Sequence, residues 1–234
     1  MKYEAIIFDV SDTLVEYSPN WAKVFGDKIR SLGIDVPEKM TWKINDAVYW
    51  ANGEQTIREQ NGAPRATEEE LGRIMDEAAL SCMDCPAELK ETYLQSMSCI
   101  PMPKQKMTVI YGVFDLLNSL RDQYRLAIVS NHYKWLVDYL KDAGLYGYFE
   151  SIIVSEAVGI EKPDVRIMEL ALNELGLPPG RCLYVGDHPL DVLCSKQAGM
   201  DCAWIAREEA ELHESIPFNE DYKISKVTQL PDIL

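Results

Sequence analysis

Short apolar runs of strand length recur along the chain and alternate, after the first, with segments of helical periodicity. The first run lies within residues 1–10 and ends in Asp9. Further runs occupy residues 125–130, 151–154, 182–186 and 202–206. Continuous apolar runs are typical of strands that are buried on both faces, and strands that alternate with helices are typical of parallel sheets. The pattern therefore predicts an α/β fold with a doubly wound parallel sheet.

The predicted helices between these strands have recognisable ends. Between residues 133 and 143 apolar positions recur at steps of three and four, and Gly144 follows. Asp164 is placed to cap a second helix, which Gly176 ends, and His188 begins a third. Small polar residues commonly cap the start of a helix, and glycine commonly follows its end. We therefore expect a helix between each pair of consecutive strands in this half of the chain.

A long insertion separates the first predicted strand from the second. It covers residues 15–107 and contains no convincing strand. Thr67 and Glu70 have the spacing of a capping box, in front of a segment of helical periodicity. We therefore predict two domains, an α/β core of residues 1–14 and 108–234 and a helical domain of residues 15–107.

Composition and charge narrow the classes of partner. The 234 residues are 47% hydrophobic and 26% charged, which is ordinary for a globular protein and argues against disorder. The net charge of −15 would repel a polyanion, so we expect no nucleic-acid partner. A small phosphorylated metabolite remains a candidate if a metal ion reverses the field locally.

The lengths of the apolar runs and the cysteine content indicate the cellular compartment. No apolar run approaches the roughly 18 residues that cross a bilayer, so we expect no membrane partner. The six cysteines are interpreted as free thiols of a reducing compartment, and we expect a cytoplasmic location. The oligomeric state is left open.

Polar residues gather directly after the predicted strands. In open parallel sheets, ligands bind at the carboxyl ends of the strands where the winding reverses. Two carboxylates about 4 Å apart repel by about 4 kcal/mol at an effective dielectric constant near 20, and a divalent cation relieves this repulsion. Hard oxygen ligands suit Mg²⁺, which is the cofactor we expect. The residues at these strand ends are Asp9, Ser11, Asp12, Thr13, Ser130, Asn131, Asp187 and Asp191, and Lys162 follows the third strand.

This set predicts phosphoryl chemistry. Asp9 can attack phosphorus and form an aspartyl-phosphate that water then hydrolyses. Lys162 and Ser130 would stabilise the transferring group as its charge redistributes.

Four short motifs resemble those of the haloacid dehalogenase superfamily. They occur in the order of that family, and together they span residues 5 to about 206. The insertion lies where the family carries its helical cap, so the resemblance implies a Rossmann-like core with a cap between motifs one and two. The matching segments are Phe8-Asp9-Val10-Ser11-Asp12-Thr13-Leu14, Val129-Ser130-Asn131, Lys162-Pro163 and Val185-Gly186-Asp187-His188-Pro189-Leu190-Asp191.

The resemblance also implies roles at the metal site. Asp9 corresponds to the nucleophile and to a metal ligand. Ser11 corresponds to the residue whose backbone carbonyl binds the metal. Asp187 corresponds to a further ligand, and Asp191 supports the metal directly or through water.

Phosphoryl and substrate binding follow by the same analogy. Ser130 and Lys162 correspond to the pair that binds the phosphoryl group, and with Asp9 they form the expected catalytic set. The adjoining polar residues are expected to bind the substrate: Ser11, Asp12, Asn131 and His132.

One position departs from the pattern of the family's phosphatases. They carry a second aspartate two residues after the nucleophile, as general acid and base, whereas this chain has Ser11. General acid–base catalysis typically contributes 10²–10⁴-fold, and an unassisted serine cannot supply it. Three explanations stay open: slow turnover, a good leaving group, or a substitute such as Asp12, His132 or His188.

Three functions compete at this point. The first is a Mg²⁺-dependent phosphohydrolase acting on a small phosphorylated metabolite. The second is a catalytically weak member that binds phosphate or a partner, which Ser11 motivates. The third is a dehalogenase-type hydrolase, in which the aspartate attacks carbon without a metal. The retained Gly186-Asp187 pair argues against the third, because surplus carboxylates would then lack compensation.

Overall fold

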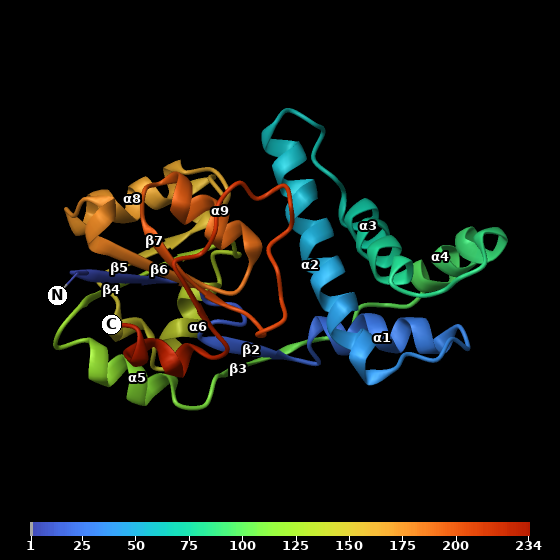
Figure 1. Ribbon diagram of the computed structural model, residues 1–234, viewed down its shortest axis with the longest axis horizontal. Coiled ribbons are helices and arrows are strands. Elements are labelled where there is room, and N and C mark those ends of the chain that lie inside the picture. Colours follow the sequence, from blue (N-terminus) through green and yellow to red (C-terminus); the bar gives the residue numbers. More distant parts are fainter. Residues whose placement is uncertain (1) are drawn as a thin grey trace. The chain divides into compact units, whose positions relative to one another are not determined.

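The computed structural model describes residues 2–234, which form two compact units. The core unit comprises the chain up to Glu16 and from Met107 onward, and the helical unit comprises Tyr17–Lys106. Figure 1 shows the elements of both units, coloured along the sequence. Each unit has its own hydrophobic core, so we describe each by itself.

A six-stranded parallel sheet forms the centre of the core unit, which confirms the predicted α/β fold. Its order is β5-β4-β1-β6-β7-β8. The chain winds from β1 outward through β4 and β5, and then from β6 outward through β7 and β8. The winding therefore reverses at β1 and β6, which is where ligands bind in such sheets. The strands are β1 (Ala5–Phe8), β4 (Arg125–Ser130), β5 (Ser151–Val154), β6 (Cys182–Gly186), β7 (Asp201–Ile205) and β8 (Tyr222–Ile224).

Helices cover both faces of this sheet (Figure 1). Alternate residues of β1 point to opposite faces of the sheet. Ile6 and Phe8 pack with α5 and α6 on one face, whereas Ala5 and Ile7 pack with α8 and α9 on the other. Burial of an isoleucine or phenylalanine contributes about 1.5–3 kcal/mol, and the continuous apolar run of β1 reflects this two-sided burial. The helices are α5 (Val113–Leu120), α6 (Leu136–Asp142), α7 (Ser155–Val158), α8 (Arg166–Leu175) and α9 (Pro189–Gln197).

Helix ends follow the expected signals with small shifts. Helix α8 ends at Gly176, which has a left-handed φ of 63°. The carboxylate of Asp164 accepts a hydrogen bond from the amide of Arg166 at 3.0 Å, although the cap residue itself is Val165. Helix α6 begins at Leu136, three residues later than its periodicity indicates.

Four α-helices, one short 3-10 helix (Ala87–Leu89) and a separate apolar core make up the helical unit. Thr67 caps α3 in a capping box with Glu70, as predicted. The ammonium of Lys28 on α1 and the carboxylate of Asp76 on α3 form a buried ion pair at 2.8 Å. The helices are α1 (Trp21–Ser31), α2 (Glu38–Gln60), α3 (Glu68–Ser81) and α4 (Lys90–Ser98).

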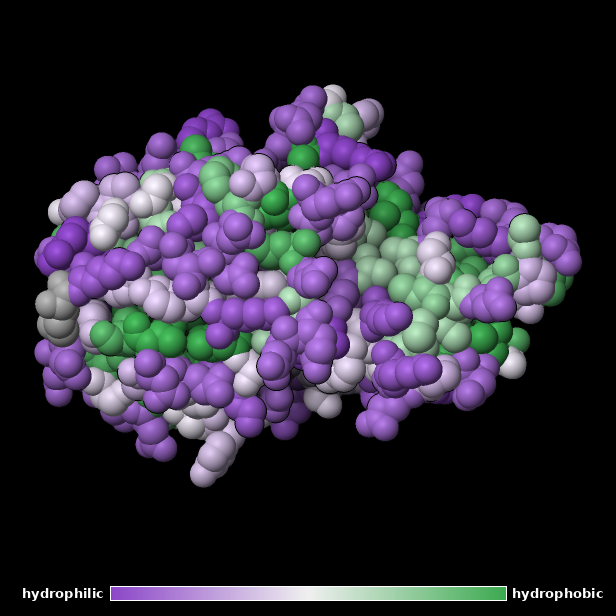
Figure 2. Space-filling model, viewed as in Figure 1, coloured by the Kyte–Doolittle hydropathy of each residue, from purple (hydrophilic) through white to green (hydrophobic). Residues whose placement is uncertain are grey.

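On the face of the molecule shown in Figure 2 the surface is mainly hydrophilic. None of the helices in residues 2–234 has both the length and the apolarity to cross a membrane.

The expectation that the insertion contains no strand is wrong. Strands β2 (Val15–Ser18) and β3 (Lys106–Val109) pair with each other at its two ends. Both are four residues long. Only one residue of β2 and none of β3 is buried, so neither forms an apolar run that the sequence pattern could reveal. The edge strand β8 also lies beyond the predicted strands, for the same reason.

Candidate active site

The end of β1 carries Asp9 into the region where the winding reverses. Its backbone amide donates to the carbonyl of Val185 on β6 at 2.9 Å, so the sheet pairing continues one residue past the strand. A tight turn follows, in which the amides of Thr13 and Leu14 donate to the carbonyl of Val10. Asp12 occupies the left-handed region of this turn, with a φ of 51°, which aspartate tolerates better than most residues. The turn thus reverses the chain directly after the carboxylate.

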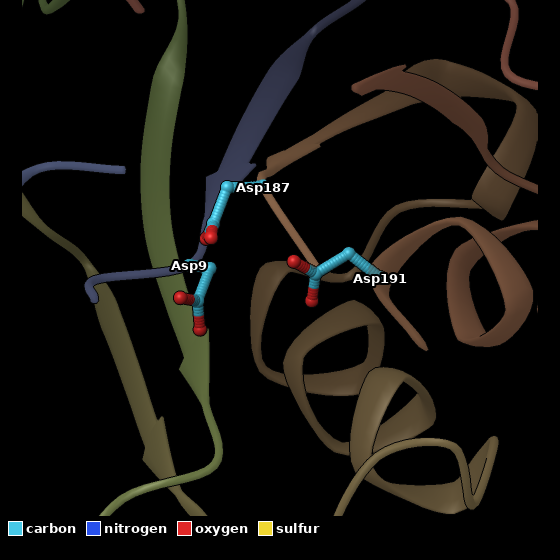
Figure 3. Close-up of side chains that lie close together, drawn as sticks. All are labelled: Asp9, Asp187 and Asp191. Atoms are coloured by element: carbon cyan, nitrogen blue, oxygen red, sulfur yellow. The ribbon is translucent and has the colours of Figure 1, made fainter. Parts of the chain in front are cut away.

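Three carboxylates from distant parts of the sequence converge at this edge (Figure 3). Asp9 follows β1, Asp187 follows β6, and Asp191 lies on α9. One oxygen atom from each lies within 4.8 Å of the other two. Asp9 and Asp191 are buried, and Asp187 is half-buried. The carboxylate of Asp187 also accepts a hydrogen bond from the hydroxyl of Thr13 at 3.2 Å.

Asp191 is held by the start of its own helix. Its Oδ2 accepts the backbone amide of His188 at 2.9 Å, and Nδ1 of His188 accepts the amide of Leu190 at 3.1 Å. His188 therefore acts as the N-terminal cap of α9. A Cβ at Gly186 would lie 2.2 Å from Oδ2 of Asp191, so only glycine lets this carboxylate come so close to β6.

Lys162 is the buried cation of this site. Its Nζ donates to Oδ1 of Asp9 at 2.8 Å and to Oδ1 of Asp191 at 2.6 Å. The side chain of Asn131 holds the backbone of the same residue: Oδ1 accepts the amide of Lys162 at 2.7 Å, and Nδ2 donates to its carbonyl at 2.9 Å. The structure therefore brings Asn131 against Lys162, and Lys162 into the carboxylate cluster.

Electrostatics at the site show an excess of negative charge. Burial raises the pKa of Asp9 to about 6, and the charge of Lys162 only partly opposes this. Burial, and then the charges of Asp12 and Asp191, raise the pKa of Asp187 well above its ordinary range. Burial alone would lower the pKa of Lys162, but Asp191 and Asp9 outweigh it and raise this pKa above its ordinary value. The charge of Lys162 therefore does not fully compensate the buried carboxylates that surround it.

The donor set fits a divalent cation. With all groups ionised, the three carboxylates and one ammonium leave a local net charge of −2, which a divalent ion would neutralise. All three side-chain donors are hard oxygen atoms, the ligands that Mg²⁺ prefers over imidazole or thiolate. Asp9, Asp187 and Asp191 are thus the residues that could hold the ion.

The other predicted site residues lie at or after the ends of β1 and β4. The hydroxyl of Ser130, at the end of β4, is buried and forms no hydrogen bond within the described chain. Ser11 is half-buried and forms a β-bridge with Val15. The backbone amide of His132 donates to Oγ of Ser155 at 3.0 Å, and burial lowers the pKa of its ring.

Two further residues bear on the site but were not singled out from the sequence. The hydroxyl of Tyr184 on β6 lies 2.9 Å from Nζ of Lys162. The indole Nε1 of Trp204 on β7 donates to the backbone carbonyl of Asp187 at 2.8 Å. Both belong to apolar strand runs, so their periodicity indicates core and gives no signal of a polar contact.

Comparison with protein families identifies the chain. The model of the haloacid dehalogenase-like hydrolases matches residues 6–205, which include the whole cluster. The chain belongs to this family. The helical region α1–α4 of this hydrolase lies between β2 and β3, consistent with the helical cap of the family.

Relatives of this haloacid dehalogenase-like hydrolase include phosphatases. Pyrimidine 5'-nucleotidase YjjG of Escherichia coli is 27% identical over 239 residues, which cover 100% of this chain and 99% of the relative. A phosphoglycolate phosphatase of Pseudomonas fluorescens is 27% identical over 204 residues, which cover 86% of this chain and 68% of the relative. The crystal structure of HAD-hydrolase YfnB from Bacillus subtilis, bound to magnesium, has a TM-score of 0.62 and 23% identity, with 100% and 99% coverage, and supports the fold.

Proposed function

We propose that this hydrolase is a Mg²⁺-dependent phosphohydrolase that acts on a small phosphorylated metabolite through an aspartyl-phosphate. The observation that carries the proposal is the pairing of Asp9 with Lys162 inside the carboxylate cluster, at the point where the sheet reverses its winding. The names of the relatives support a phosphate ester as substrate.

The proposed reaction has two steps. A carboxylate oxygen of Asp9 attacks phosphorus, the bond between phosphorus and the ester oxygen breaks, and the leaving alcohol takes up a proton. Water then attacks phosphorus, the bond to Asp9 breaks, and inorganic phosphate leaves as the water gives up a proton. Lys162 and the buried hydroxyl of Ser130 donate hydrogen bonds to the transferring group. Asp9, Asp187, Asp191 and the backbone carbonyl of Ser11 would hold Mg²⁺, which would supply the positive charge that admits a phosphate dianion.

A panel of phosphate esters with and without Mg²⁺ tests the proposal. We expect hydrolysis of nitrophenyl phosphate with Mg²⁺, and its loss when a chelator removes the ion, because the cluster would otherwise repel the dianion. Release of inorganic phosphate is the measurement, and readdition of Mg²⁺ after the chelator is the control. Activity undiminished by the chelator would contradict the proposal.

The same panel addresses the substrate class. Nucleoside monophosphates and phosphoglycolate belong in it, because the relatives are a pyrimidine 5'-nucleotidase and a phosphoglycolate phosphatase. Ser11 motivates the second candidate, a catalytically weak protein that binds phosphate or a partner. If phosphate is its ligand, such a protein would bind inorganic phosphate but hydrolyse every ester of the panel slowly.

A dehalogenase-type reaction fits the site less well. Attack of Asp9 on carbon requires no cation, which would leave the three converging carboxylates with Lys162 as their compensation. Nitrophenyl phosphate and a 2-haloacid, assayed side by side, separate the two reactions.

Ser11→Asp is expected to raise kcat for alkyl phosphates by about 10²-fold, the lower end of a general acid–base contribution. A poor alkoxide leaving group needs a proton from an acid, whereas nitrophenolate does not, so the rate with nitrophenyl phosphate should change much less. Ser11→Asn is the matched control, because it adds the same volume without an acidic proton. Equal rates for the two variants would indicate that another residue already supplies the proton.

A further inference from the structure

The ring of Tyr184 lies on the face of the sheet that α8 and α9 cover. It is fully buried and packs in the same cluster as Ile7 and Val129. Its hydroxyl donates to the carbonyl of Val129 at 2.8 Å. Val129 belongs to β4, which β1 separates from β6 in the sheet, so the side chain of Tyr184 reaches across one strand. Burial of the ring and this hydrogen bond together fix the position of the phenol oxygen.

That oxygen faces the ammonium of Lys162. A phenol has one proton, and the bond to Val129 is shorter than the 3.3 Å contact between the hydroxyl and Oδ1 of Asp191. With its proton on the Val129 bond, the oxygen accepts a hydrogen bond from Nζ of Lys162 at 2.9 Å. Tyr184 therefore supplies a neutral acceptor between two charged ones.

The three hydrogens of the Lys162 ammonium have three partners. These are Oδ1 of Asp9 at 2.8 Å, Oδ1 of Asp191 at 2.6 Å and the hydroxyl of Tyr184 at 2.9 Å. A phosphoryl oxygen that receives a hydrogen bond from Lys162 must take the place of one of them. An ammonium rotates freely about its last carbon–nitrogen bond. When a phosphoryl oxygen replaces one carboxylate partner, the bond to Tyr184 and the bond to the remaining carboxylate still fix this rotation.

We propose that Tyr184 is a positioning residue that fixes the rotation of the Lys162 ammonium, so that its remaining hydrogens face Asp9 and the transferring phosphoryl group. Asn131 holds the backbone of Lys162, and Tyr184 holds the opposite end of its side chain. The inference rests on the proposed phosphohydrolase function for its catalytic consequence, and on the three hydrogen bonds for its geometry.

Tyr184→Phe is the first test, since it removes the hydroxyl and keeps the ring. We expect kcat for nitrophenyl phosphate to fall about ten-fold, because a ten-fold loss corresponds to part of the energy of a hydrogen bond to a charged group. We expect KM to stay within about two-fold. The loss should fall on kcat because the ammonium contributes most when charge redistributes in the transition state. Tyr3→Phe is the matched control: it removes a buried tyrosine hydroxyl that donates to Asp201 at 2.8 Å, and we expect kcat and KM unchanged.

The ¹⁵N-edited NMR signals of lysine ammonium groups provide a second readout that needs no turnover. We expect one protected signal from Lys162 in the wild type, with a cross-peak to the ring of Tyr184, and displacement of that signal in Tyr184→Phe but not in Tyr3→Phe. An unmoved signal, no cross-peak, or a lower melting temperature at unchanged kcat in Tyr184→Phe would overturn the proposal. If the wild type hydrolyses no phosphate ester, the proposed function fails, and the NMR signals still decide whether Tyr184 holds the ammonium.

Discussion

Asp9→Asn is expected to lower kcat for nitrophenyl phosphate by roughly 10³-fold or more, as removal of a nucleophile does in other hydrolases. The amide cannot attack phosphorus, and it also removes one of the three carboxylates that could hold Mg²⁺. Asparagine keeps the size of the side chain and can still accept a hydrogen bond from Lys162, so the fold should persist. Steady-state kinetics with Mg²⁺, together with circular dichroism, provide the measurement.

Asp138→Asn is the matched control for that variant. Asp138 is an exposed carboxylate on α6 whose ion pair with Lys141 spans 3.3 Å at the surface. The same chemical change there should leave kcat within about two-fold, because exposed pairs contribute little. Residual activity of Asp9→Asn within ten-fold of the wild type would indicate a different nucleophile.

Lys162→Met is expected to remove most of the activity and to lower the free energy of unfolding by about 3–5 kcal/mol, the usual cost of breaking a buried ion pair. Methionine fills the space of the aliphatic chain but leaves Asp9 and Asp191 buried without their ammonium. Added Mg²⁺ should restore part of the lost stability, because the ion supplies the missing positive charge. Urea unfolding with and without Mg²⁺, followed by circular dichroism, measures both effects.

Lys141→Met makes the same change at the surface. The side chain of Lys141 is 52% exposed, and its loss should alter the free energy of unfolding by less than about 0.5 kcal/mol, with no response to Mg²⁺. A Lys162→Met protein as stable as the wild type, or one that Mg²⁺ leaves unchanged, would show that Lys162 does not compensate the cluster.

Local patterns were sufficient for the central strands. Strands β4, β5 and β6 have the bounds that their apolar runs indicate, because a strand that is covered on both faces is apolar along most of its length. The motifs likewise led to Asp9, Lys162, Asp187 and Asp191, since the segments that leave the carboxyl ends of parallel strands all begin at the same edge of the sheet. In each case the signal is a short apolar run or a short motif, and it is contained in a few neighbouring residues of the sequence.

The amino-acid sequence by itself determined the fold class, the helical insertion and the acids that meet at the sheet edge. Only the tertiary structure decided that β2 pairs with β3, that Gly186 leaves room for the carboxylate of Asp191, and that Tyr184 reaches across β1 to Lys162. Each of these is a contact between backbone or side-chain atoms that the chain brings together from separate segments. Apolar periodicity reports which face of an element is buried, whereas such contacts depend on distances that exist only after the elements have packed.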